Sequence, residues 1–175
     1  MSAAPLSALL DEYEVAQTWS AALTDGLTED QVQWRPDENS SAIAWHLGHQ
    51  GAVNHFMVRN LTAAEVSFNR GFDAIFDSAT PEPGRGELPS VEAIMAYRAS
   101  IAQSTKRTIE MIASGNVGAP NQLPVIANAM IKSIINHEYQ HAKWIGEVRD
   151  TFLGTPAPEP ASSNLAQIDG YWMVR

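Results

Sequence analysis

Cysteine is absent from the 175-residue sequence. The chain can therefore form no disulfide, no thiolate metal site and no cysteine nucleophile. Metal ligands would have to come from histidine, aspartate and glutamate. Any thiol chemistry would depend on a thiol supplied from outside the chain.

Basic residues are also scarce, with 11 Lys and Arg against 20 Asp and Glu and a formal net charge of -9. This balance argues against nucleic acid and against an anionic membrane surface as partners. No apolar run approaches the length of a transmembrane helix, and the first residues lack the basic region and apolar segment of a signal peptide. We therefore expect a cytoplasmic protein.

Alternation of apolar and polar residues with period two is nearly missing, so we expect almost no sheet. Helical periodicity instead predicts amphipathic helices at residues 6–23, 42–61, 91–113 and 126–152, with a short helical turn that starts at Thr28. The length suits one domain with a real core. Four long helices with one long connection predict an all-α four-helix bundle.

Two segments fall outside the helical pattern. Residues 68–89 combine an aromatic cluster with prolines and glycines, which predicts a crossover loop of the kind that often covers a site. The proline-rich stretch after Gly154 predicts an extended tail. We therefore divide the chain into a bundle domain, residues 1–153, and a tail, residues 154–175, that packs on the domain or on the partner subunit of a homodimer.

His137 and His141 are the first candidates for a functional site. They lie four residues apart on a predicted helix, so both imidazoles share one face and can reach one metal ion. With Glu138 they also spell H-E-x-x-H, the short signature of zinc peptidases in which the glutamate is the general base. A histidine pair on a helix also occurs on surfaces and in cores without any metal.

A catalytic metal site of the zinc type usually has three protein ligands and one open position. Three further histidines, His46, His49 and His55, fall on the predicted helix 42–61. Spacing does not choose between His46 and His49, whereas His55 lies well round the helix. The sequence therefore supplies two of the three expected ligands, His137 and His141, and more than one candidate for the third.

The segments SAIAWHLGH (residues 41–49) and NHEYQH (residues 136–141) together resemble the DinB/YfiT-like superfamily. Residues 27–30 and 34–36 are similar to the opening of that family, and the resemblance covers most of residues 6–150. Members are four-helix bundles that hold a divalent metal with one histidine of the second helix and an H-x-x-x-H pair of the last. The resemblance implies His49, His137 and His141 as ligands, because the family's histidine lies four residues after the position of Trp45.

The same resemblance implies the chemistry. The family includes thiol-dependent S-transferases and a mycothiol-dependent isomerase, in which the metal would bind a low-molecular-weight thiol and lower its pKa. We therefore expect a metal-dependent enzyme of the S-transferase, isomerase or hydrolase type with a small-molecule substrate. Zinc, nickel or iron would suit three imidazoles. The resemblance assigns no catalytic residue.

Other residues near these positions have expected roles. His46 would be an additional histidine near the mouth of the site or in a helix contact, and Glu138 would face solvent or orient a ligand. Arg149 shares the face of His141, so it would meet an anionic substrate or form a surface salt bridge. Trp45 and Trp144 are expected in the core rather than as a stacking platform.

Three alternatives compete with this interpretation. A zinc peptidase lacks support, because Trp144 stands where the metzincin extension has glycine and no suitable downstream glutamate ligand follows. A ferritin-like di-iron site needs a second Glu-x-x-His motif, which the sequence does not contain. A metal-stabilised bundle that binds a ligand without turnover stays open.

Overall fold

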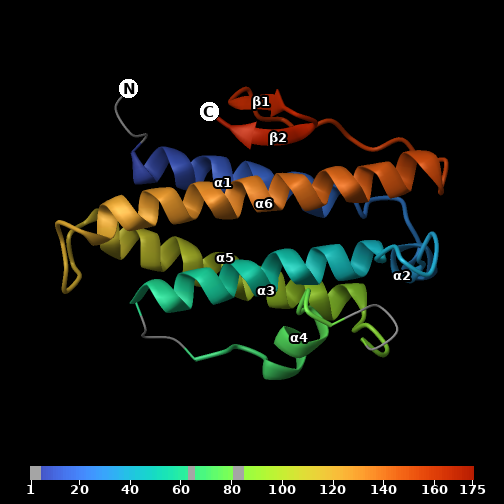
Figure 1. The fold of residues 1–175 in the computed structure, drawn as a ribbon, viewed down its shortest axis with the longest axis horizontal. Coiled ribbons are helices and arrows are strands. Elements are labelled where there is room, and N and C mark those ends of the chain that lie inside the picture. The colour runs from blue at the N-terminus through green and yellow to red at the C-terminus, as the bar shows by residue number, and fades with distance from the viewer. Residues whose placement is uncertain (1–4, 63–65, 81–84) are drawn as a thin grey trace.

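Four long helices lie side by side along the long axis of the molecule (Figure 1). The computed structural model describes residues 5–62, 66–80 and 85–175. The long helices are α1 (Leu6–Ala22), α3 (Ile43–Thr62), α5 (Val91–Ala113) and α6 (Leu123–Thr151). Two short helices, α2 (Glu29–Gln33) and α4 (Arg70–Ile75), and one antiparallel hairpin of β1 (Leu165–Ile168) and β2 (Tyr171–Val174) complete the described part. The expectation of a mostly helical chain is confirmed, and the arrangement is compatible with a bundle.

Local sequence explains the helix ends. At α2, the Thr28 hydroxyl accepts from the Gln31 N–H while the Gln31 side chain accepts from the Thr28 N–H, which is the capping box that the sequence predicts. Ser90 caps α5 by accepting from the backbone N–H of Ala93. Helix α6 begins at Leu123, three residues before the predicted start, because Pro124 is tolerated in a first turn whose N–H groups have no helical partner.

Helices α1 and α6 run in one direction and α3 and α5 in the other (Figure 1). Because α3 and α5 are parallel, the chain must cross back along the molecule between them. The predicted loop at residues 68–89 lies in this connection, and it contains the short helix α4, which packs on α3. Part of the predicted loop, residues 81–84, lies outside the described residues. We call residues 66–80 the crossover segment.

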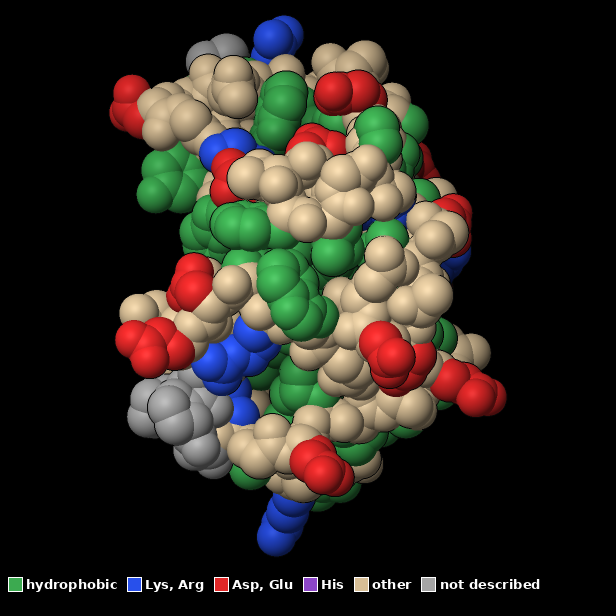
Figure 2. Space-filling model, turned by 90° about the vertical axis from the view of Figure 1, so that its right-hand side faces the viewer, with side chains coloured by type: hydrophobic (Ala, Val, Ile, Leu, Met, Phe, Trp, Pro, Cys, Tyr) green, Lys and Arg blue, Asp and Glu red, His purple; other side chains and the backbone are tan. Residues whose placement is uncertain are grey.

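The core lies between the four long helices and is formed mainly by aliphatic side chains. Its fully buried members include Leu47 of α3, Ile101 of α5 and Ile135 of α6. Among the described residues, none of the helices combines the length and the hydropathy that a membrane span requires. At the end of the molecule shown in Figure 2, acidic side chains are spread around a band of apolar ones.

One buried arginine contacts all four long helices. Arg98 of α5 forms an ion pair with Glu138 of α6, with 2.5 Å between Nη2 and Oε1. Its Nη1 donates to the carbonyl of Leu47 and to Oε1 of Gln50, both on α3 and both at 2.8 Å. Its Nη2 also donates to Gln17 of α1 at 3.1 Å. Arg98 and Glu138 are only 3% and 1% exposed, so this network fixes α3 relative to α6 in the interior.

The tail folds back on α1 and α6 rather than extending into solvent. Trp19 Nε1 donates to the carbonyl of Pro158 at 2.7 Å, and the Val174 N–H donates to Asn136 Oδ1 at 2.8 Å. Residues 165–174, part of the predicted extended tail, form the β-hairpin, which turns through Asp169 and Gly170, both with positive φ. The sequence does not predict these strands, because four residues per strand give too little alternation.

The buried ion pair predicts a large effect of Arg98→Met on stability. The substitution leaves the Glu138 carboxylate buried without its charge partner, which should lower the free energy of unfolding by about 3–5 kcal/mol. Denaturant unfolding of the metal-free protein measures this. Replacing both partners, Arg98→Met with Glu138→Leu, should restore much of the loss.

A surface pair supplies the control. Lys106 and Glu14 form an ion pair at 2.5 Å with side chains 51% and 57% exposed. Lys106→Met should leave stability nearly unchanged, since solvent screens such pairs. Equal effects of Arg98→Met and Lys106→Met would contradict the structural role of Arg98.

Candidate metal centre

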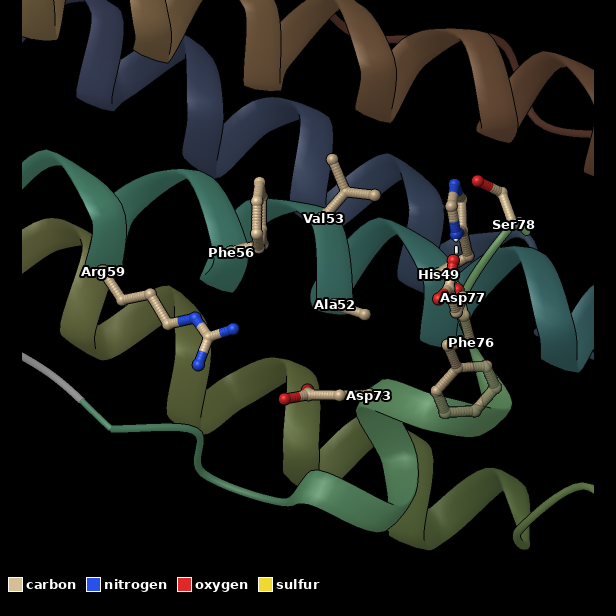
Figure 3. Close-up of a pocket in the computed structure, with 9 residues that line it drawn as sticks. All are labelled: His49, Ala52, Val53, Phe56, Arg59, Asp73, Phe76, Asp77 and Ser78. Carbon is tan, nitrogen blue, oxygen red and sulfur yellow. Dashed lines mark hydrogen bonds between the residues drawn. The ribbon is translucent and has the colours of Figure 1, made fainter. Parts of the chain in front are cut away.

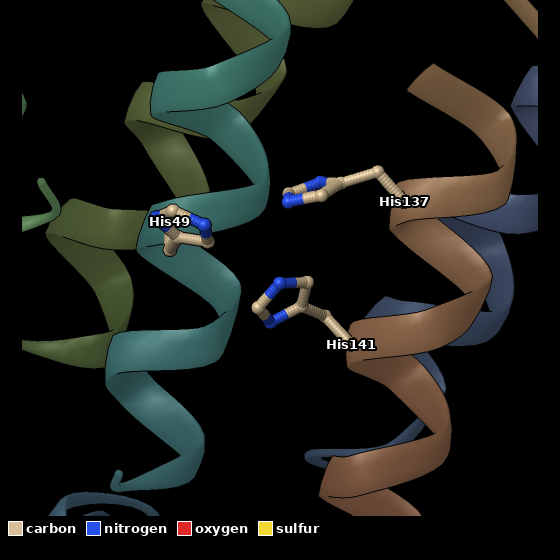
Figure 4. Close-up of side chains that lie close together, drawn as sticks. All are labelled: His49, His137 and His141. Atoms are coloured by element: carbon tan, nitrogen blue, oxygen red, sulfur yellow. The ribbon is translucent and has the colours of Figure 1, made fainter. Parts of the chain in front are cut away.

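Three histidines face one another between α3 and α6 (Figure 4). One ring nitrogen from each of His49, His137 and His141 lies within 4.8 Å of the others. The ring centroids are 4.4 Å apart for His137 and His141 and 4.8 Å apart for His49 and His141. A tetrahedral zinc ion with nitrogen ligands at about 2.0–2.1 Å needs about 3.3 Å between them, so small side-chain rotations would suffice. These three histidines could therefore hold a metal ion.

The backbone of the crossover segment orients His49. Its Nδ1 lies 2.7 Å from the carbonyl oxygen of Phe76, and a carbonyl only accepts, so Nδ1 carries the proton. The lone pair is then on Nε2, the nitrogen left for a metal. The Trp45 ring stacks on His49 with centroids 4.5 Å apart and 12° between planes. Trp45 is 5% exposed, so it is a core residue, as expected, and also stacks on a ring of the cluster.

Gly48 makes this orientation possible. A Cβ atom at this position would overlap the Phe76 ring, whose side chain is fully buried against α3. Only glycine lets Phe76 approach closely enough for its carbonyl to meet His49. The short distance between α3 and the crossover segment is therefore part of how the site is built.

His46 also contacts the cluster, from one turn earlier on α3. Its Nδ1 lies 2.9 Å from Nδ1 of His141, so one ring donates to the other. His46 is 9% exposed, and the Trp144 ring lies edge-on to His141 at 4.8 Å. Trp144 is 37% exposed, so the expectation that it lies in the core is wrong.

Burial keeps all four histidines neutral near pH 7. Together with a smaller contribution from the neighbouring histidines, burial lowers the pKa of His46 to about 3 and that of His137 to about 4. It also lowers the pKa of His49 and of His141 below the usual range. Neutral imidazole is the form that binds a metal, so the donor set fits a divalent ion without first losing protons.

Two residues expected at the site have other positions. Glu138 does not face solvent, because it is buried and paired with Arg98. Arg149 is 4% exposed, and its Nη1 donates to the carbonyls of Leu23 and Asp25 at 2.6 and 3.1 Å. The expected surface salt bridge of Arg149 is therefore wrong, and the residue joins α6 to the end of α1. It lies about 12 Å along the helix from His141.

His55 and Asn136 contact other parts of the chain. His55 is buried and lies away from the cluster, where its Nε2 accepts from the Phe68 N–H at 3.3 Å. Asn136, next to His137, anchors β2. Sequence reasoning missed Phe76, since a backbone carbonyl leaves no residue signal, and it missed Arg85, whose guanidinium carbon lies 3.8 Å from the Trp45 ring centroid.

A groove of about 390 Å³ opens beside His49 (Figure 3). One wall is the face of α3 that carries Ala52, Val53 and Phe56, and the other is the crossover segment. Arg59 lies at the end of the α3 wall away from His49. One member of the histidine cluster, His49, therefore lines a cavity of small-molecule size.

The fold and the cluster define a helical protein with a possible three-histidine metal site between two helices. The DinB superfamily model matches residues 12–145, more than half of the chain. The protein belongs to the DinB superfamily, as the resemblance of the two histidine segments implied. Comparison with curated proteins gives no match.

The close approach at Gly48 predicts the effect of Gly48→Ala. The new methyl group would displace Phe76, lower the free energy of unfolding by about 1–3 kcal/mol and weaken the bond that orients His49. Thermal unfolding and zinc titration of the purified protein measure the two effects. Gly118→Ala is the control, because nothing lies within 4 Å of a Cβ there. Unchanged zinc affinity in Gly48→Ala would show that the Phe76 carbonyl does not matter for His49.

The lowered histidine pKa values predict a pH dependence for the metal-free protein. Between about pH 6.5 and pH 4 the unfolded chain binds protons at these histidines and the folded protein does not, so stability falls as the pH falls. Each histidine contributes up to about 1.4 kcal/mol per pH unit. Urea unfolding from pH 7.5 to 5 measures the slope, which His46→Gln should reduce. A slope unaffected by this substitution would contradict the lowered pKa of His46.

Proposed function

We propose that His49, His137 and His141 bind one divalent metal ion and that the protein is a metal-dependent enzyme. Zinc, nickel and iron all suit a three-imidazole site. The observation that carries the proposal is the convergence of three neutral ring nitrogens within 4.8 Å beside an accessible groove. We propose that the four long helices form a four-helix bundle of the DinB type. This bundle holds together the faces of α3 and α6 that carry the histidines.

We propose further that the enzyme uses a low-molecular-weight thiol, in a reaction of the S-transferase or isomerase type. The chain has no cysteine of its own. A divalent ion with an open position would lower the pKa of a bound thiol and so supply the nucleophile. Membership of the DinB superfamily supports this chemistry more directly than any single contact.

The chain's own residues would orient the ligands. The Phe76 carbonyl holds the proton of His49 on Nδ1. His46 would accept the Nδ1 proton of His141, which leaves Nε2 of His141 for the ion. Trp45 and Trp144 lie against these rings and limit their rotation.

The position of Glu138 argues against a zinc peptidase. A peptidase base must reach a water molecule at the metal, but this carboxylate is 1% exposed and paired with Arg98. Within the described residues, the only strands are those of the C-terminal hairpin, which packs on α6 rather than beside the groove. No sheet edge there could hold a peptide substrate.

A homodimer is also proposed. Trp34 and Phe152 are 41% and 53% exposed and contact each other with ring centroids 6.2 Å apart. Exposed apolar rings that lie together support a subunit contact at this place. The proposal does not require the tail, which already packs on its own chain.

Metal content of untagged protein tests the site. We expect about one divalent ion per chain and its loss when His49, His137 or His141 is changed to Ala, because two imidazoles bind far more weakly than three. Elemental analysis after gel filtration measures this. His55→Gln is the control, since this histidine faces the crossover segment. Stoichiometric metal in His49→Ala would refute the three-ligand assignment.

A screen of cellular thiols with electrophiles tests turnover. The metal-loaded protein should consume both partners, and the three alanine variants should not. A protein that only binds would show a rise in melting temperature without product, and that result would replace the enzyme by a metal-stabilised binding bundle.

A further inference from the structure

The groove beside His49 has a defined length and two different ends (Figure 3). Its α3 wall runs from His49 to Arg59, ten residues or about 15 Å along the helix. Because helical side chains lean toward the N-terminus, Arg59 extends back toward the middle of the groove. A ligand in the groove would therefore meet an imidazole at one end and a guanidinium at the other.

The α3 wall of the groove is apolar between its two ends, where Ala52, Val53 and Phe56 recur at helical spacing. The facing wall carries polar side chains, Asp73, Asp77 and Ser78, beside the buried Phe76. Phe56 is 58% exposed, and the Arg59 guanidinium lies over its ring, 5.7 Å from the centroid. An exposed aromatic ring in a concave site is a typical contact for the body of a small molecule.

The two carboxylates of the groove already have hydrogen-bond donors. Asp73 accepts from the Tyr97 hydroxyl at 2.8 Å through Oδ1 and from the Ser67 hydroxyl through Oδ2. Asp77 accepts from the Ala79 N–H at 2.9 Å. These bonds hold the crossover segment in shape, so neither aspartate is placed primarily to receive a ligand.

Arg59 differs from both aspartates. Within the described ranges its guanidinium has no hydrogen bond and no ion pair, and its Nε is buried without a partner. A buried N–H without an acceptor is costly, so a rotation of the side chain that brings Nε to a ligand oxygen would be favoured. A guanidinium matches a carboxylate in a two-bond arrangement. The nearby Asp73 and Asp77 would repel a doubly charged phosphate more than a singly charged carboxylate.

We propose that the groove binds a small molecule with an apolar body and one terminal carboxylate. The carboxylate pairs with Arg59, the body lies on Phe56 and Val53, and the other end lies beside the histidine cluster. This deepens the proposed function, since that end would be the electrophile on which the thiol acts. The binding of the carboxylate itself requires no metal.

Two matched probes test the groove. 6-Phenylhexanoate and 6-phenylhexan-1-ol differ in the terminal group and are titrated calorimetrically into full-length protein, both metal-free and metal-loaded. The acid should bind about tenfold to hundredfold more tightly than the alcohol, the range expected for a charge-assisted pair. Arg59→Met should remove this preference, because it keeps the apolar stem and loses the donors. Arg70→Met, an exposed arginine outside this groove, is the control.

A blocking variant tests the location. Ala52→Trp should abolish binding of both probes, while the circular-dichroism melting curve shows that the protein is folded. If Arg59→Met does not fold, Arg59→Gln replaces it with the same expected loss of preference. Equal affinity for acid and alcohol, an unchanged preference without Arg59, or binding that survives Ala52→Trp would each overturn the proposal.

The metal-free arm separates the two proposals. A preference for the acid that depends on Arg59 in metal-free protein supports the groove even where no thiol reaction is found. Loss of that preference in protein that retains metal and thiol turnover overturns the groove alone.

Discussion

The buried pair of Arg98 and Glu138 is the interaction on which the geometry of the rest depends. Two charges removed from water are costly unless every donor and acceptor is used, and here one guanidinium bonds to α1, α3 and α6 from its position on α5. Gln50 and Glu138 are direct neighbours in sequence of His49 and His137. The network therefore fixes the positions of α3 and α6 next to the histidines that they carry.

The histidine cluster shows how an apolar interior prepares a polar site. Burial lowers the pKa of the rings, and the Phe76 carbonyl and His46 then provide the contacts that define which nitrogen carries a proton. Trp45 stacks on the His49 ring, and one nitrogen of His49 still lies within 4.8 Å of a nitrogen of both His137 and His141. The aromatic residues thus restrict orientation, and the polar contacts select the tautomer.

Sequence periodicity predicted much of the helical structure, since α5 at residues 91–113 begins and ends where its apolar stripe and caps place it. Spacing alone left His46 and His49 open, and only the family resemblance selected His49. Arg98 was not recognised, because a single polar residue on an amphipathic helix gives no sign of being buried. Glu138 and Arg149 were expected near solvent or substrate for the same reason, since partners on distant helices decide their burial.

The connection between α3 and α5 gives the two sides of the site different tolerance to insertion and deletion. One residue added within α3 or α6 would rotate the following part of the helix by about 100° and separate the histidines. The crossover segment, in contrast, lies on the outside of the helices and can change in length at modest entropic cost. The wall that faces a ligand can therefore diverge while the imidazoles stay in register, provided that the Phe76 carbonyl is kept.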